Sequence, residues 1–115
     1  MNVVMYGIPN CDTIKKAKTW LADHNVEFEF HDYRKQGVPQ DTLQHALNTL
    51  GWETLLNKRG TTYKQLSEEQ KASVSADTAL ALLTAHPAMI KRPLLLVEQD
   101  FHVGFKAPQY EEIFA

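Results

Sequence analysis

The sequence holds one cysteine, Cys11, and its position is typical of a reactive thiol. It follows a short apolar run, residues 3–6, and precedes a segment with helical periodicity. The first turn of a helix presents unpaired N–H groups and the positive end of the helix dipole, and both stabilise a thiolate. Lys15 follows one helical turn later and can add positive charge on the same face, whereas the charge of Asp12 opposes this. We therefore predict that Cys11 is a nucleophile.

The ordinary alternative for Cys11 is a small apolar residue of the core, as many single cysteines are. Its place in a turn, residues 7–13, opposes that reading because turns are more often exposed than buried. Ile14 stands where a Cys-x-x-Cys pair would have its second cysteine, so a disulfide step needs an external thiol. No metal site is expected, because there is no second cysteine and the histidines lack helical ligand spacing.

A second feature is the pair Arg92-Pro93, directly before the apolar run of residues 94–97. A proline there can be a plain strand start, because the first residue of a strand need not donate a ladder hydrogen bond. Arg92 can equally be a surface charge. Taken alone, the pair is weak evidence: it fits a strand start and a surface charge as well as a role near the thiol.

The elements around these residues predict an α/β fold. A strand over residues 3–6, a helix from residue 11 to about 25 and a strand over residues 26–31 form a β-α-β unit with parallel strands. The end of the chain predicts a strand over residues 94–97, a hairpin partner over 101–105 and a last helix from Pro108 through Phe114.

The middle of the chain is predicted to be helical. Apolar stripes over residues 43–50 and 76–83 indicate two helices, and Ser67 with Gln70 resembles a capping box that opens a third. Residues 57–62 have the composition of a loop.

Length and composition limit the function classes. With 115 residues, 43% hydrophobic and 23% charged, the chain is expected to be one domain, 1–115, with an ordinary soluble composition. A net charge of −2 argues against direct nucleic-acid binding, and no segment suits a membrane span or a signal peptide. We expect a cytoplasmic protein whose thiol is kept reduced.

Four stretches together resemble the arsenate reductase (ArsC)/Spx family, and most closely its YffB-type branch. They are residues 6–17 around Cys11, residues 56–63 around Arg59, residues 89–93 ending in Pro93, and Val103-Gly104-Phe105. The resemblance runs through most of the chain. It implies a thioredoxin-like fold with a helical insert at about residues 37–90, between the second and third strands.

The resemblance also implies roles for site residues. Cys11 would be the nucleophile and Pro93 the fold's cis-proline facing it. Arg59 and Arg92 match family arginines that surround an oxyanion, for which forked guanidinium donors are suited. The alternative for Arg59 is a solvated loop charge.

Two further residues complete the predicted site. Lys15 would help the arginines to hold the anionic part of a substrate, and Thr13 would support the thiolate through its hydroxyl or backbone N–H.

The implied activity is a glutathione-dependent thiol oxidoreductase with one nucleophilic cysteine. No bound cofactor is expected, and the expected partners are glutathione as co-substrate or a glutaredoxin-like protein. An Spx-like module that binds RNA polymerase without catalysis is the alternative, although the Cys-x-x-Cys switch of many such regulators is absent.

Arsenate reduction comes third. Lys106 stands where arsenate reductases of this type carry another arginine, and Asp12 replaces the small residue that follows their cysteine.

Overall fold

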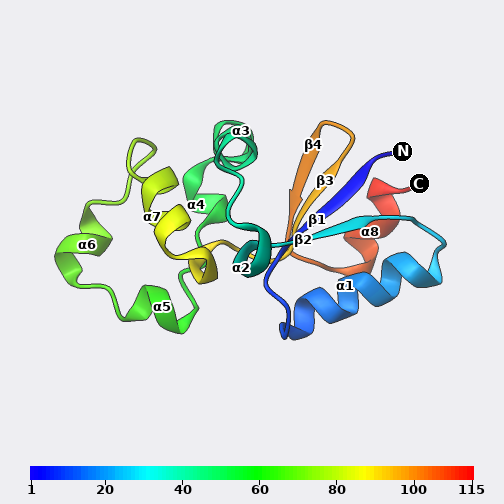
Figure 1. Cartoon of the computed structure of the whole chain (residues 1–115), viewed down its shortest axis with the longest axis horizontal. Coiled ribbons are helices and arrows are strands. Elements are labelled where there is room, and N and C mark those ends of the chain that lie inside the picture. The colour runs from blue at the N-terminus through cyan, green and yellow to red at the C-terminus, as the bar shows by residue number, and fades with distance from the viewer. The chain divides into compact units, whose positions relative to one another are not determined.

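The computed structural model describes residues 1–115, and the chain divides into two compact units (Figure 1). The first unit joins the two ends of the chain, Met1–Asp32 and Arg92–Ala115, and the second is the continuous segment Tyr33–Lys91. The second unit contains the helical insert predicted at residues 37–90 and is slightly wider at both ends.

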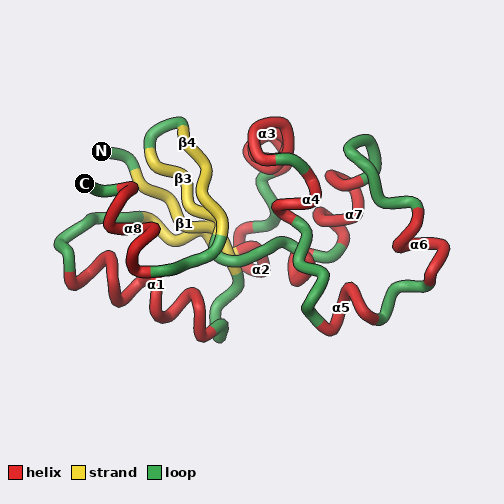
Figure 2. The backbone as a smooth tube through the Cα atoms, turned by 180° about the vertical axis from the view of Figure 1, so that it is seen from behind, coloured by secondary structure: helices red, strands yellow, loops and turns green.

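The first unit is a four-stranded sheet with two helices (Figure 2). The strand order is β2-β1-β3-β4; β2 is parallel to β1, while β3 is antiparallel to both β1 and β4. This architecture confirms the predicted α/β fold. Its elements are β1 (Val3–Gly7), α1 (Asp12–Asp23), β2 (Glu29–Asp32), β3 (Leu94–Val97), β4 (Asp100–Val103) and α8 (Ala107–Ile113).

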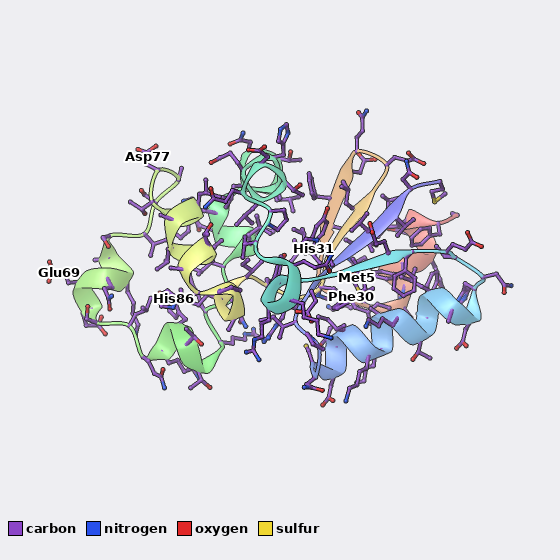
Figure 3. All side chains as sticks on the ribbon, in the orientation of Figure 1. Met5, Phe30, His31, Glu69, Asp77 and His86 are labelled. Carbon is purple, nitrogen blue, oxygen red and sulfur yellow. The ribbon has the colours of Figure 1, made fainter.

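Helices α1 and α8 cover one face of this sheet. The buried side of α1 consists of Ile14, Ala17 and Leu21, which repeat at helical spacing, and α8 contributes Tyr110. From the sheet, Met5 is fully buried, and its register partner Phe30 packs against the same core (Figure 3). Complete burial of each large apolar side chain contributes roughly 1.5–3 kcal/mol, so this core holds α1 on the sheet.

The second strand differs from the prediction. It begins at Glu29, not at residue 26, and Val26 still belongs to the end of α1. Asn25 has a left-handed backbone (φ 58°), and the N–H of Val26 donates to the carbonyl of Leu21 at 2.9 Å. The alternating pattern that starts at Val26 therefore includes a helix terminus as well as a strand.

The second unit consists of short helices. They are α2 (Tyr33–Gln36), α3 (Gln40–Leu50), α4 (Trp52–Leu55), α5 (Thr61–Lys64), α6 (Glu68–Ala72), α7 (Ala79–Ala85) and the 3-10 turn η1 (Pro87–Met89). The predicted stripe of α3 is buried through Leu43, Ala46 and Leu47, and α7 buries Ala79 and Leu83.

Two details of this unit test the sequence patterns. The capping box of α6 is confirmed, since Gln70 N–H donates to Ser67 Oγ at 3.1 Å and Ser67 N–H to Gln70 Oε1 at 2.9 Å. The predicted loop over residues 57–62 is wrong at its end, because α5 begins at Thr61.

No helix of either unit has the length and apolar character needed to cross a bilayer.

Candidate active site around Cys11

Cys11 is the N-cap residue of α1. Its backbone is extended (φ −110°, ψ 125°), its carbonyl accepts the first helical hydrogen bond from Lys15 N–H at 3.0 Å, and its side chain makes no capping bond. The thiol is partly exposed. The first turn of a helix leaves its N–H groups unpaired and carries the positive end of the helix dipole, so it favours a negative charge nearby. The structure thus places Cys11 at the predicted helix start, and its role as a nucleophile stays a prediction.

The loop before Cys11 is held by one unusual backbone conformation and one close packing contact. Asn10 has φ 68°, in the left-handed region that asparagine tolerates better than most residues. Gly7 lies at the end of β1, where a Cβ atom would collide with Cδ1 of Ile14 in the first turn of α1. The start of the helix is thus seated directly on the end of the strand, which fixes Cys11 at the carboxyl end of the sheet.

Arg92 and Pro93 lie beside that end of the sheet. The bond between them is cis, as the family resemblance implied. The next residue, Leu94, pairs with Tyr6 of β1, and the carbonyl of Pro93 accepts a hydrogen bond from Gly104 N–H at 2.9 Å. Pro93 is buried and Arg92 is half-buried. The register places both next to the strand that leads into the Cys11 loop.

Thr13 and Lys15 share the first turns of α1 with Cys11. Thr13 is half-buried and Lys15 is exposed. No carboxylate lies within ion-pair distance of Lys15 or Arg92, so both cations can receive an anion. Asp12 is an exposed acid in the first turn and lowers the net positive charge of this end of the helix.

Arg59 belongs to the helical unit. It is exposed in the loop before α5, and its backbone N–H donates to Oδ1 of Asn57 at 3.2 Å. Its predicted contribution to an anion site with Cys11 stays a prediction.

The structure adds Asp32, a residue that the sequence patterns did not single out. It is a buried charged side chain, 7% exposed, and it pairs with Gly7 at the carboxyl ends of β2 and β1. Its neighbour on β2, His31, lies against Tyr6 with ring centroids 5.2 Å apart. The sequence places this acidic residue directly after the predicted strand over residues 26–31, at the end of a strand where ligands collect, but no local pattern shows that it is buried.

The comparisons with known proteins bear on this arrangement. The profile of the ArsC family matches residues 6–113, nearly the whole chain. The chain belongs to the ArsC family. A Haemophilus influenzae protein is 45% identical over 113 residues, which cover 98% of this chain and 99% of that protein.

Other members of the ArsC family extend the comparison. The solved structure of a YffB protein is 44% identical and superposes with a TM-score of 0.94, covering 99% of this chain and 100% of that one. The transcriptional regulator Spx of Lactiplantibacillus plantarum is 26% identical over 105 residues, 90% of this chain and 79% of the regulator. The thioredoxin-like fold and the YffB-type branch are thereby confirmed.

Proposed function

We propose that this ArsC-family protein is a thiol oxidoreductase that uses Cys11 as its single nucleophile and glutathione as its co-substrate. The observation that carries the proposal is the place of Cys11. It is a partly exposed N-cap residue of α1 at the carboxyl end of β1, with Arg92 and Pro93 beside that end.

The proposed reaction has two exchanges. The Cys11 thiolate attacks the glutathione sulfur of a mixed disulfide, the substrate leaves as its thiolate and takes up a proton, and a disulfide between Cys11 and glutathione forms. A second glutathione thiolate then attacks the glutathione sulfur of that adduct. Oxidised glutathione leaves and the Cys11 thiolate is restored, so one glutathione is consumed for each substrate thiol released.

The cations at this end of the unit would orient the substrate. Glutathione carries two carboxylates, and Lys15 and Arg92 are the cations of the Cys11 end that no carboxylate neutralises. A guanidinium can bind a carboxylate with two parallel hydrogen bonds, so Arg92 suits this role. Arg59 would be a further anion ligand, and Thr13 would support the thiolate. The chemistry needs a reduced Cys11, which fits a cytoplasmic protein.

The test is the reduction of a glutathione mixed disulfide of a small thiol, followed by coupled consumption of NADPH by glutathione reductase. Cys11→Ser should abolish turnover. Lys15→Ala should raise the KM for the mixed disulfide several-fold, whereas the matched variant Lys16→Ala, on an exposed neighbour, should not. Turnover that survives in Cys11→Ser would refute the proposal.

A second candidate is a binding module without catalysis, favoured by the 26% identity to Spx over 90% of this chain. Stoichiometric capture of purified RNA polymerase, equal for the wild type and Cys11→Ser, would support it. Arsenate is the third candidate. If arsenate replaces the mixed disulfide as the better substrate, the same nucleophile would serve oxyanion chemistry despite Lys106.

A further inference from the structure

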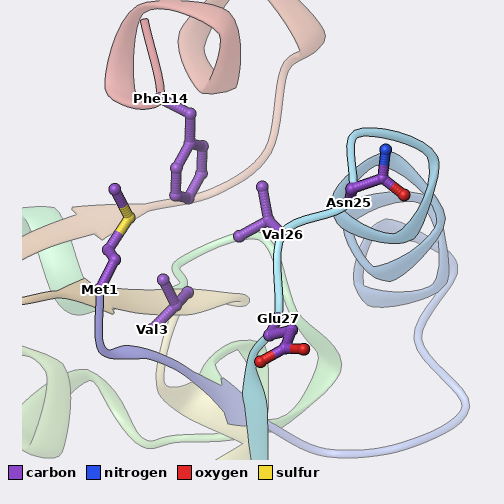
Figure 4. A pocket seen from close by; sticks show the side chains of 6 residues that line it. All are labelled: Met1, Val3, Asn25, Val26, Glu27 and Phe114. Atoms are coloured by element: carbon purple, nitrogen blue, oxygen red, sulfur yellow. The ribbon is translucent and has the colours of Figure 1, made fainter.

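An acidic groove lies at the opposite end of β1 from Cys11. It occupies about 590 Å³, and Val4 and Leu96 are the apolar side chains of its floor, while its rim carries Glu27, Glu29 and Glu98. Phe28, which packs against the core, also lines it. A second hollow of about 360 Å³ shares Met1, Val3 and Glu27 with it and continues to Val26 and Phe114 (Figure 4). We call the larger of these two hollows the acidic groove.

The sheet register explains why apolar side chains are accessible there. Glu29, Val4 and Leu96 lie side by side on β2, β1 and β3, on the face opposite the core residue Met5. Val4 and Leu96 are half-buried. One step along the same face toward Cys11, Tyr6 and Leu94 are 7% and 1% exposed. On β1 and β3, the accessible apolar side chains of this face are therefore those at this end of the strands.

On the side of the rim formed by Glu27 and Glu29, no ion pair compensates the negative charge. No lysine, arginine or histidine lines either hollow. Glu98 is partly engaged, since its Oε1 accepts a hydrogen bond from Asn2 N–H at 2.9 Å and lies 3.9 Å from the Met1 amine. Glu27 and Glu29 are exposed and form no ion pair. Two free carboxylates thus border an accessible apolar floor.

We propose that the acidic groove binds a basic segment of a partner protein, in which aliphatic and cationic side chains alternate. The charge of the rim selects the partner: lysine or arginine head groups would pair with Glu27 and Glu29. The aliphatic side chains, and the hydrocarbon stems of the cations, would cover Val4 and Leu96. This binding is independent of the thiol chemistry at Cys11.

Another explanation of the glutamates is protective. β2 is an edge strand, and charged side chains on an edge keep it from pairing with a strand of another molecule. That explanation predicts no affinity for a basic apolar segment, so a titration separates the two.

The first experiment is an amide NMR titration of the full chain with a short peptide of alternating lysine and leucine. Saturable shifts at Val4, Phe28, Glu29 and Leu96 are expected. A peptide of alternating lysine and glycine should bind more weakly, because it cannot cover the floor, and one of glutamate and leucine should not bind. Absence of saturable shifts, or equal shifts with the glycine peptide, would overturn the proposal.

The second experiment tests the rim. The double variant Glu27→Lys/Glu29→Lys should weaken the lysine-leucine peptide about tenfold or more, since two attractions become repulsions. Glu111→Lys/Glu112→Lys changes the net charge equally on exposed residues of α8 and is the control. Equal loss in both variants would indicate general charge attraction and refute the site. A dimer found by sedimentation in the wild type but not in Glu27→Lys/Glu29→Lys would refute the proposed partner.

Discussion

Ile14 is seated on Gly7. The side chain of Ile14, in the first turn of α1, occupies the space that a Cβ atom at Gly7 would need, and Ile14 itself is 1% exposed. Because Cys11 is the N-cap of the same helix, this contact links the end of β1 to the position of the thiol. Only glycine, which has no Cβ atom, leaves room for that approach.

Substitution Gly7→Ala should therefore destabilise the protein. A methyl group forced into a packed core costs about 1–3 kcal/mol, and urea unfolding would measure it. Alkylation of Cys11 by iodoacetamide should change in rate if the displaced Ile14 side chain moves α1, and an unchanged rate would show that only Ile14 repacks. The control is Gly60→Ala, where the new Cβ would meet only the side chain of Asn57, with its nitrogen at 3.0 Å. An effect of Gly7→Ala no larger than that of Gly60→Ala would contradict the packing argument.

The left-handed backbone of Asn10 leads to a second prediction. Asn10→Gly should keep stability within a few tenths of a kcal/mol, because glycine adopts φ 68° without strain. Asn10→Val should lose roughly 1–2 kcal/mol, because a β-branched residue is strained in that region. The pair of variants is compared by thermal and urea unfolding, with Cys11 alkylation as the local readout. Equal stability of the two variants would show that the conformation imposes no cost.

The Tyr110 hydroxyl leads to a prediction of increased stability. This side chain is 0% exposed, and its hydroxyl makes no hydrogen bond within the protein. Because an unpaired buried polar group is costly, Tyr110→Phe should leave stability unchanged or raise it by about 1 kcal/mol. The rings of Phe105 and Trp20, which meet Tyr110 edge-on, would keep their contacts. A loss of more than about 1 kcal/mol in urea unfolding would mean that the hydroxyl has a partner.

Alkaline pH should widen the difference in stability between Tyr110→Phe and the wild type. Burial raises the pKa of Tyr110 above its ordinary value of 10.0. The unfolded chain therefore loses this proton at a lower pH than the folded chain, so stability present below pH 10 is lost as the pH rises beyond it. The difference in unfolding free energy between Tyr110→Phe and the wild type should grow above pH 10. A constant difference would contradict the raised pKa.

For His102, we predict that the free energy of unfolding falls at acidic pH. Burial lowers its pKa below the ordinary 6.5, although the nearby Asp100 carboxylate raises it in part. The unfolded state therefore binds the proton of His102 more readily than the folded state. The contribution of neutral His102 to stability is present above pH 6.5 and is lost as the pH falls through and below that value. His102→Gln should flatten this part of the curve measured by urea unfolding at several pH values.

Asp100→Asn serves as the directional check on His102. Removing the carboxylate removes the influence that raises the pKa, so the loss of stability on acidification should become larger in this variant. A smaller loss would contradict the assigned causes.

Local patterns predicted most of the fold. The buried stripe of α1, the apolar run of β3 and the Ser67 capping box depend on neighbours within a few residues, so the sequence displays them. The predicted start of β2 was wrong because the strand begins where Glu29 pairs with Val4, a partner distant in sequence. Alternation from Val26 onward could not show where that pairing begins.

The candidate site was predictable to a similar degree. The place of Cys11 at a helix start follows from a strand, a turn and a helical period in order. The burial of Asp32 depends on the sheet register and on side chains distant in sequence, so no local pattern contains it. Pairing with β1 likewise places Pro93 beside the Cys11 loop, and only the family resemblance suggested that position in advance.

The central strands come from opposite ends of the polypeptide: Val3 of β1 pairs with Val97 of β3. During synthesis, β1 and Cys11 leave the ribosome before β3, the antiparallel neighbour of β1. The segment Tyr33–Lys91 is continuous and is complete before that neighbour emerges. The part of the sheet beside Cys11 can therefore be completed only after the whole segment Tyr33–Lys91 has been synthesised, and its folding depends on pairing between residues distant in sequence.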